Sequence, residues 1–176
     1  RIPTSELLAI CRAAPPSLGA DPRATADRPT TPCARTDCCR DAGFLVTYSH
    51  VRDTLADRCY RTIFECLAAD PSKTFNVAEV NFFSHWFDRQ NSTVQSQVKE
   101  ITVAGQYWFA EGGWVQPDEG CTTVLGRINQ ATLGQEWLAE RLGVFPTSGW
   151  HMDPFGNSAV SPKLYDAYGF DSHVVS

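Results

Sequence analysis

Strand-like and helix-like segments alternate along this chain after residue 44, and this alternation constrains its fold more than any other feature. Short apolar segments have the composition of buried strands, and amphipathic helical patterns separate them. A chain that alternates in this way builds parallel βαβ units in an α/β fold. The expected strands are residues 44–48, 75–80, 107–110, a segment ending at Asp153, and 170–175; the expected helices are residues 52–69, a second from Ser92 or Thr93 up to Gly105, residues 119–142, and a fourth from Ser158 or Ser161 to Tyr168.

The segment from Glu119 to Leu142 has the clearest helical pattern. Its apolar residues fall within an arc of roughly 140°, so one side of the helix is expected to pack against a sheet. Pro117, Asp118 and Glu119 fit a helix start with acids in the first turn, and Gly143 fits the helix end. The expected buried arc consists of Cys121, Val124, Leu125, Ile128, Ala131, Leu138 and Leu142.

Residues 1–43 differ in composition from the rest of the chain. They are rich in proline, arginine, alanine and threonine and lack helical or strand periodicity, so we predict a poorly ordered or divergent segment there. Residues 44–176 are predicted to form the folded domain. The 7 cysteines form no repeated Cys-x-x-Cys pair, which argues against a thiolate zinc site. Their odd number leaves at least one thiol unpaired within this chain.

The composition limits the classes of partner. Apolar residues make up 43% of the chain, which is ample for a packed core, and the net charge of −5 argues against nucleic acid or an anionic membrane as the main partner. A neutral ligand such as a sugar is compatible with this charge. No apolar run reaches the roughly 18 residues of a transmembrane helix. Asn91, Ser92 and Thr93 form an N-glycosylation sequon, so Asn91 is a candidate glycosylation site.

Asp153 is the residue best placed for chemistry. An apolar segment delivers its carboxylate to the end of a strand, and Pro154 and Gly156 then break the backbone. Loops at such strand ends collect the side chains of a site, although the same pattern fits an aspartate that caps the following helix. Four further acids stand near the expected strand ends: Glu79, Glu111, Asp118 and Glu119.

Five motifs, in order, resemble the N-terminal catalytic domain of class II α-mannosidases, glycoside hydrolase family 38. Each motif alone is common, but their order and spacing over roughly residues 52 to 172 are specific. The Thr-Leu-Gly motif, and the Phe-Phe-Ser-x-Trp motif followed by the sequon, are closer to the lysosomal-type branch than to the Golgi branch. The motifs are residues 75–84 (FNVAEVNFFS), 111–115 (EGGWV), 117–119 (PDE), 132–134 (TLG) and 150–156 (WHMDPFG).

The resemblance implies a fold and a reaction. The fold would be a partial seven-stranded (β/α) barrel, with parallel strands alternating with helices, inside a longer polypeptide. The reaction would be retaining hydrolysis of terminal α-linked mannose from glycans, with zinc as cofactor, in the lysosome or the secretory pathway. Asp153 would be both the nucleophile and a zinc ligand, and Phe155 would bind the substrate from beneath the sugar. A second carboxyl group about 5–5.5 Å away would protonate the leaving oxygen.

Three of the four zinc ligands implied by the resemblance are missing from this chain. The family's His-x-Asp-x-Gly-Trp motif should fall near residues 29–36, which here read PTTPCART. The family's acid/base aspartate and last zinc-binding histidine would lie beyond Ser176, and Asn157 stands where the family carries His or Tyr. His151 has a counterpart in the family that is not a ligand, so we assign it no metal role. The acid/base role is not transferred to any of the four other acids.

Two classes of function therefore remain open. The first is an enzyme, part of a retaining α-mannosidase, with this fragment expected to be inactive on its own. The alternative is a non-catalytic carbohydrate-binding or interaction fragment of the same fold, and a weaker alternative is a metal-dependent carbohydrate deacetylase. The expected partners are a mannose-containing glycan and the remainder of the parent polypeptide, without nucleic acid or membrane. The chain would be a piece of a larger enzyme, or a divergent or wrongly predicted gene product.

Overall fold

The computed structural model describes residue 42 and residues 46–152 and 155–175. Over these residues the fold is mixed α/β with two pairs of parallel strands, in agreement with the predicted alternation. The described residues divide into two compact units. The first holds the residues up to Asn76 together with Arg89–Trp108, and the second holds Val77–Asp88 and the residues from Phe109 onward. The poor order predicted for residues 1–43 falls outside the described residues, apart from residue 42.

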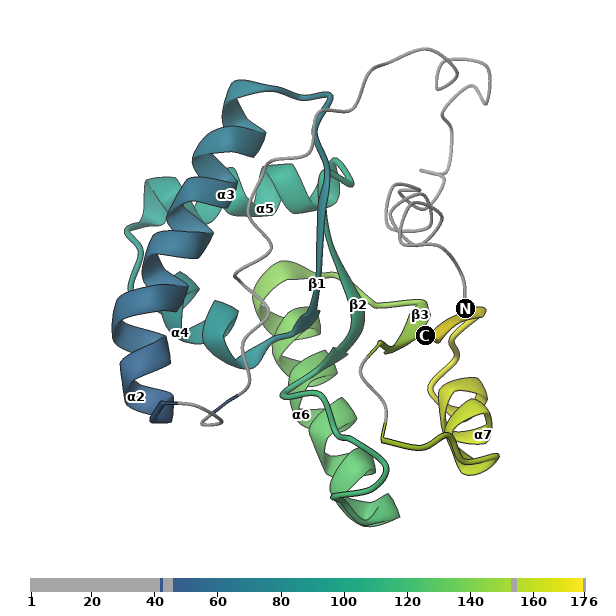
Figure 1. Cartoon of the computed structure of the whole chain (residues 1–176). Coiled ribbons are helices and arrows are strands. Elements are labelled where there is room, and N and C mark those ends of the chain that lie inside the picture. Colours follow the sequence, from purple (N-terminus) through teal and green to yellow (C-terminus); the bar gives the residue numbers. More distant parts are fainter. Residues whose placement is uncertain (1–41, 43–45, 153–154, 176) are drawn as a thin grey trace, which may run out of the picture. The chain divides into compact units, whose positions relative to one another are not determined.

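The first unit begins with a continuous helical run (Figure 1). The helix predicted at residues 52–69 is confirmed and starts earlier than expected. The strand predicted at residues 44–48 is wrong in its described part, because Thr47 caps a helix there and accepts a hydrogen bond from the His50 N–H at 3.3 Å. The run consists of α2 (Tyr48–His50), the π-helical stretch η1 (Val51–Ala56) and α3 (Asp57–Ala69).

A second helix, α5 (Ser92–Val103), contacts α3 within the first unit. Its buried residues include Val98 and Ile101, as the helical pattern predicts. Its cap is Asn91 rather than the predicted Ser92 or Thr93, since the Asn91 side chain accepts a hydrogen bond from the Val94 N–H at 3.0 Å. The facing residues of α3 are buried at helical spacing: Tyr60, Ile63, Phe64 and Leu67.

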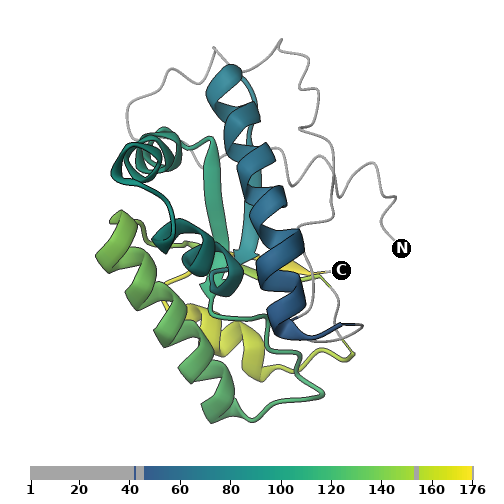
Figure 2. The ribbon, with the colours of Figure 1, turned by 90° about the vertical axis from the view of Figure 1, so that its left-hand side faces the viewer.

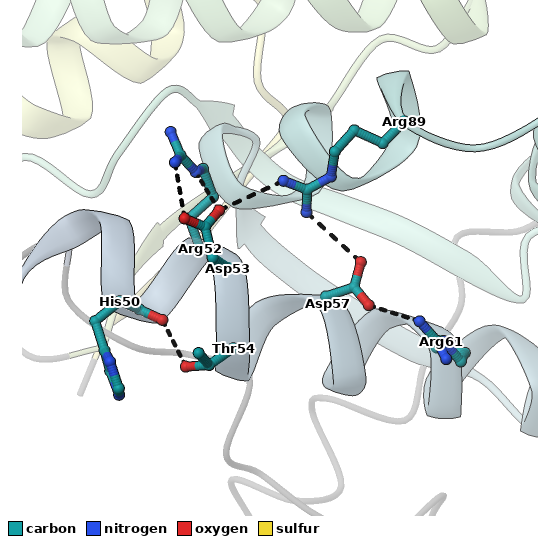
Figure 3. Close-up of polar contacts among 7 residues, drawn as sticks. All are labelled: His50, Arg52, Asp53, Thr54, Asp57, Arg61 and Arg89. Atoms are coloured by element: carbon teal, nitrogen blue, oxygen red, sulfur yellow. Dashed lines mark hydrogen bonds and ion pairs between the residues drawn. The ribbon is translucent and has the colours of Figure 1, made fainter.

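Arg89 joins the segment before α5 to the helical run (Figure 3). Its guanidinium lies 3.6 Å from a carboxylate oxygen of Asp53 and 3.5 Å from one of Asp57. Asp57 also accepts a hydrogen bond from Arg61 at 2.7 Å. The Arg89 side chain is 45% exposed, so solvent screens these ion pairs. Their contribution to stability is therefore small.

The strands β1 (Phe75–Glu79) and β2 (Tyr107–Gly113) form a parallel pair. The Phe75 N–H donates to Gln106 at one end and the Val80 N–H donates to Gly113 at the other, so both strands run in the same direction. Both predicted strands are confirmed, and β2 continues beyond its predicted end through the two glycines.

The second unit has an aromatic core between α4 (Asn81–Asp88) and α6 (Val124–Leu142), which lie against each other (Figure 2). The ring of Phe83 is edge-on to Trp137 with centroids 5.8 Å apart, and Phe87 meets the same indole at 5.7 Å. Edge-to-face geometry of this kind stabilises aromatic pairs beyond their buried area. The aromatic run after β1 is therefore part of the core.

Helix α6 corrects the predicted start at Glu119 and part of the predicted buried arc. Thr123 caps the helix, since its side chain accepts from the Gly126 N–H at 3.0 Å, and the residues before it form a loop. Cys121 is consequently outside the helix and exposed. The helix ends at Gly143, which has a φ of 71°. The exposed residues of the predicted arc are Cys121, Val124 and Leu125, and the buried residues of the helix are Arg127, Ala131, Gly134, Leu138 and Leu142.

The second unit ends with a β3–α7–β4 crossover (Figure 1). The two strands are parallel, with Ser148 opposite Ser172 and His151 opposite Val175. Gly149 lies under the Tyr165 ring of α7, where a Cβ would lie 2.7 Å from the nearest ring carbon. The elements are β3 (Ser148–His151), α7 (Val160–Ala167) and β4 (Ser172–Val175), close to their predicted positions. Within the described ranges, no helix has the length and apolar character required to cross a membrane.

Candidate functional site

The loop that follows β3 contains the predicted nucleophile. Asp153 and Pro154 lie outside the described residues, so the flanking residues define the site. His151, the last residue of β3, is buried, and Phe155 is 78% exposed. The predicted substrate-binding ring is therefore on the surface of the second unit, two residues beyond the predicted nucleophile.

Asp118 contacts the C-terminal side of this loop. Its Oδ1 accepts a hydrogen bond from the Phe155 backbone N–H at 3.2 Å. Burial tends to raise the pKa of Asp118, but hydrogen bonds from the Cys121 thiol and from the backbone N–H groups of Phe155 and Gly120 outweigh it, so the pKa lies below its ordinary value. The carboxylate form is the one that accepts these hydrogen bonds.

Glu119 lies at the N-terminal side of the loop, and its side chain is 7% exposed. One carboxylate oxygen, Oε1, lies 3.7 Å from Nδ1 of His151 and 3.4 Å from Nη1 of Arg127. The Ser161 hydroxyl donates to the same oxygen and accepts from Nη1 of Arg127 at 2.6 Å. Arg127 comes from the first turn of α6 and Ser161 from the first turn of α7, so two helices fix this carboxylate.

The two histidines of the β3–β4 pair, His151 and His173, also lie near Glu119. Their rings are nearly parallel, with centroids 6.5 Å apart, and His173 meets the Tyr165 ring at 4.5 Å. Burial and the nearby His151 lower the pKa of His173, which favours its neutral form. Glu119 Oε2, both ring nitrogens of His151 and Nε2 of His173 are buried, and none of them has a hydrogen-bond partner among the described residues.

Glu111 is a buried acid in the bend at the end of β2. Glu111 is 3% exposed and has a φ of 58°, which is uncommon for any residue other than glycine. Burial raises its pKa to about 8, since the opposing effect of Arg127 is smaller and Glu79 adds a further increase. Glu79 has a structural contact of its own, because its carboxylate accepts from the Gln116 N–H at 3.2 Å.

The predicted glycosylation site is at the surface. Asn91 is exposed at the start of α5, and so are Ser92 and Thr93 of its sequon. His85 is exposed on α4, with its ring 6.5 Å from that of Trp114. Cys121 has a free, exposed thiol, whereas Cys59 and Cys66 are disulfide-bonded.

The described residues do not by themselves fit a zinc site. No group of three or more His, Cys, Asp or Glu side chains in the described ranges is arranged to hold a metal ion. Asp153, the ligand predicted in this chain, is outside those ranges. A zinc site with one ligand from this chain requires the others from elsewhere.

Sequence reasoning missed Arg127 and Ser161. Arg127 was not singled out from the sequence, and its burial is matched by Glu119 and Ser161 as polar partners. A signal was present in Ser161, since a serine just before Pro162 is typical of a helix start. Asp118 and Glu119 were singled out, but as helix-start residues or acids rather than as contacts of the loop after β3.

Comparisons with known proteins agree with the motifs. Residues 37–176 match the family described as "Glycosyl hydrolases family 38 N-terminal domain". The chain is 39% identical to "Alpha-mannosidase C" of Dictyostelium discoideum over 77% of this chain and 13% of that protein. It is 33% identical to "Alpha-mannosidase 2" of Spodoptera frugiperda over 77% of this chain and 12% of that protein. It is 37% identical to "Lysosomal alpha-mannosidase" of Homo sapiens over 62% of this chain and 11% of that protein.

The chain spans about an eighth of the length of the curated relatives it matches. The family match nevertheless covers every described element from α2 to β4. The family predicted from the five ordered motifs is therefore confirmed: this chain belongs to glycoside hydrolase family 38, and its residues 37–176 correspond to the N-terminal domain of that family.

Proposed function

We propose that this chain is part of the catalytic domain of a retaining α-mannosidase, which removes terminal α-linked mannose from glycans. The observation that carries the proposal is the match of residues 37–176 to the N-terminal domain of family 38, together with relatives that are named as α-mannosidases. Since the chain spans about an eighth of those relatives, the activity is proposed for the parent polypeptide. The 176-residue chain alone is expected to be inactive.

Asp153 is the proposed nucleophile. Its carboxylate would attack the anomeric carbon and form a covalent glycosyl ester while the bond to the leaving oxygen breaks. A second carboxyl group would give its proton to the leaving oxygen, and would then take a proton from the water that hydrolyses the ester. Phe155 is the proposed substrate platform, because an exposed ring two residues after Asp153 in the sequence offers an apolar face to the C–H groups of a sugar.

The second carboxyl group is not assigned to any described acid. Glu111 carries a proton at neutral pH, but it is buried beneath the end of β2. Asp118 and Glu119 are held by the contacts described above. We therefore propose that the acid/base group comes from the remainder of the parent polypeptide, in agreement with the position that the family resemblance implies.

The cofactor and the complete fold are also proposed for the parent polypeptide. Zinc is the expected metal, with Asp153 as the ligand from this chain and the other ligands from other segments. The two parallel strand pairs and their crossovers are proposed to be part of a seven-stranded (β/α) barrel, in which residues 44–176 form a partial catalytic domain. Parallel strands occur almost only in sheets whose faces are covered by helices of an α/β fold, which supports a larger sheet.

We further propose that the parent polypeptide is a glycoprotein of the lysosome or the secretory pathway. Three relatives are named as lysosomal α-mannosidases, from Dictyostelium discoideum, Bos taurus and Homo sapiens. The sequon at Asn91 is exposed, which is the accessibility that glycosylation requires.

The proposed function is tested with the full-length parent polypeptide and an aryl α-mannoside. Wild type should release mannose with its α configuration retained, as followed by NMR of the first-formed anomer, and Asp153→Asn should abolish turnover. An activated fluoromannoside that traps the glycosyl ester should label a peptide containing Asp153. Full turnover by Asp153→Asn would contradict the assignment. Mannose binding without turnover in the wild-type parent would instead favour the non-catalytic alternative.

A further inference from the structure

Trp114 is the aromatic residue of the 111–115 motif, and the mechanism proposed above does not use it. It directly follows Gly113, the last residue of β2, and it is half-buried. Glu79 ends β1, which runs parallel to β2, so the two residues lie at the same edge of the strand pair. Ligands of α/β folds bind at the carboxyl ends of parallel strands. Trp114 is therefore a candidate for ligand binding outside the segment of Asp153.

Two helices fix the backbone of Trp114. Its N–H donates to the carbonyl oxygen of Gln130 in α6 at 2.9 Å, and its carbonyl oxygen accepts from the N–H of Asn81, the first residue of α4, at 3.0 Å. The side chain of Gln130 also accepts from the Val115 N–H at 3.1 Å. The backbone that carries the indole is therefore ordered before a ligand binds, which lowers the entropic cost of binding.

The imidazole of His85 lies beside the indole. The ring centroids are 6.5 Å apart and the ring planes are inclined by 67°, so the rings are edge-on rather than stacked. His85 is exposed on α4, one helical turn after Asn81, whose N–H bonds to Trp114. Two rings at such an angle form a corner, with an aromatic surface on one side and a hydrogen-bonding imidazole on the other.

The carboxylate of Glu79 adds a polar group near this corner. Its Oε1 accepts from the Gln116 N–H at 3.2 Å, and Gln116 is two residues after Trp114. A carboxylate offers about four acceptor positions on its two oxygens, so it can bind several donors at once. An aromatic surface with a few polar groups is typical of small-ligand sites. With a carboxylate among those groups, the corner fits a neutral, hydroxyl-rich ligand such as a sugar better than an anion.

We infer that Trp114, His85 and Glu79 form a second sugar-binding subsite, which holds a sugar residue of the glycan other than the mannose that is cleaved. The inference rests on the proposed function, because that function supplies a glycan as the substrate. The indole contacts the C–H groups of the sugar ring, and the imidazole and the carboxylate bind its hydroxyl groups. The subsite therefore contributes to the binding of oligosaccharides and not to the binding of a single mannose on an aryl group.

Trp114→Ala tests the subsite in the full-length parent polypeptide with two substrates, an aryl α-mannoside and a mannose-terminated oligosaccharide. We expect kcat/KM to fall about 5- to 10-fold more for the oligosaccharide than for the aryl mannoside, with the difference mainly in KM. Trp114→Phe keeps an aromatic face and should lose less. Trp108→Ala is the matched control, because Trp108 is also half-buried and lies near the start of β2. It should change kcat/KM by the same factor for both substrates.

His85→Ala makes the same comparison at an exposed residue, where a substitution changes the free energy of unfolding little. We expect a loss of roughly two- to fivefold in kcat/KM that is specific to the oligosaccharide, as for one lost hydrogen bond. His50→Ala, at an exposed histidine of α2, should show no such specific loss. Circular dichroism and the thermal midpoint establish that each variant is folded. If Trp114→Ala does not fold, Trp114→Phe and His85→Ala decide the inference.

The outcomes are distinct from those of the proposed function. Equal losses on the two substrates for Trp114→Ala would show that the indole supports the fold instead of binding a sugar, and would overturn the inference. An oligosaccharide KM that stays at the wild-type value in both Trp114→Ala and His85→Ala would overturn it too. If the wild-type parent turns over neither substrate, the proposed function fails, and calorimetry then measures binding of the oligosaccharide. Weaker binding to Trp114→Ala than to Trp108→Ala would still support the subsite, whereas equal binding would contradict it.

Discussion

Gly134 of α6 lies directly against the backbone of Gly112 near the end of β2. A Cβ atom at Gly134 would lie 2.1 Å from the carbonyl oxygen of Gly112, well inside any allowed contact. The helix can approach the strand this closely only because residue 134 has no side chain. This close approach determines which side of α6 is buried in the second unit.

Gly134→Ala is therefore expected to destabilise the fold. In an ordinary helix interior the same change stabilises by about 1 kcal/mol, because alanine has the higher helix propensity. Here the methyl group meets backbone that cannot move aside, and we expect a loss of roughly 1–3 kcal/mol in the free energy of unfolding. Urea denaturation of the 176-residue chain measures it. Thr132→Ala, at an exposed position of the same helix, is the control; a stabilised Gly134→Ala would contradict the structure.

Glu111 should make the stability fall as pH rises. Its folded-state pKa of about 8 lies above the ordinary value of 4.5, so between these values the folded state binds more protons than the unfolded state. The free energy of unfolding then decreases with pH through this window and is highest below it. Thermal midpoints at pH 5 and pH 8 give the test, and Glu111→Gln should flatten the difference. An equal pH dependence in Glu111→Gln and in the exposed control Glu136→Gln would contradict this prediction.

Asn91 should carry an N-linked glycan when the parent polypeptide is expressed in a secretory system. Its Oδ1 caps α5, and a glycan on Nδ2 leaves that oxygen able to accept from Val94. Enzymatic deglycosylation should shift the electrophoretic mobility of wild type and leave Asn91→Asp and Thr93→Ala unchanged. The Asp variant keeps a capping oxygen, so a loss of stability in it would reflect the glycan rather than the cap. A shift that persists in both variants would place the glycan elsewhere.

Phe155 is the proposed substrate-binding residue, and Phe145 is a suitable control because its exposure is similar. They are 78% and 75% exposed respectively, so changing either to Ala should leave the free energy of unfolding nearly unchanged. We expect only Phe155→Ala to lower kcat/KM of the full-length parent, by roughly tenfold, because a lost stacking contact is worth about 1 kcal/mol. Equal activity of the two variants would argue against a sugar platform at Phe155.

Most local features of the sequence were predicted correctly. The alternation of strands and helices follows from apolar periodicity, and Gly143 ends α6 because its left-handed backbone suits glycine. The family followed from five short motifs in order. None of these inferences requires knowledge of which segments meet in space.

Two errors are local, the strand predicted at residues 44–48 and the cap of α5. The other errors occur where distant residues decide. Helix α6 starts at Val124 instead of Glu119 because residues 117–123 are drawn into contact with the loop after β3. Cys121 is therefore outside the helix and exposed, while Arg127 is buried. Such choices depend on partners more than thirty residues away, as with Arg127 and Ser161.

The sequence by itself determined the alternating elements, the family and the residues expected to carry the chemistry, because these are properties of short segments. Only the tertiary structure decided that Asp118 and Glu119 flank the loop of Asp153 instead of opening a helix. A carboxylate at that point can satisfy either the N–H groups of a helix start or those of a neighbouring loop, and the packing of α6 and α7 selects the loop.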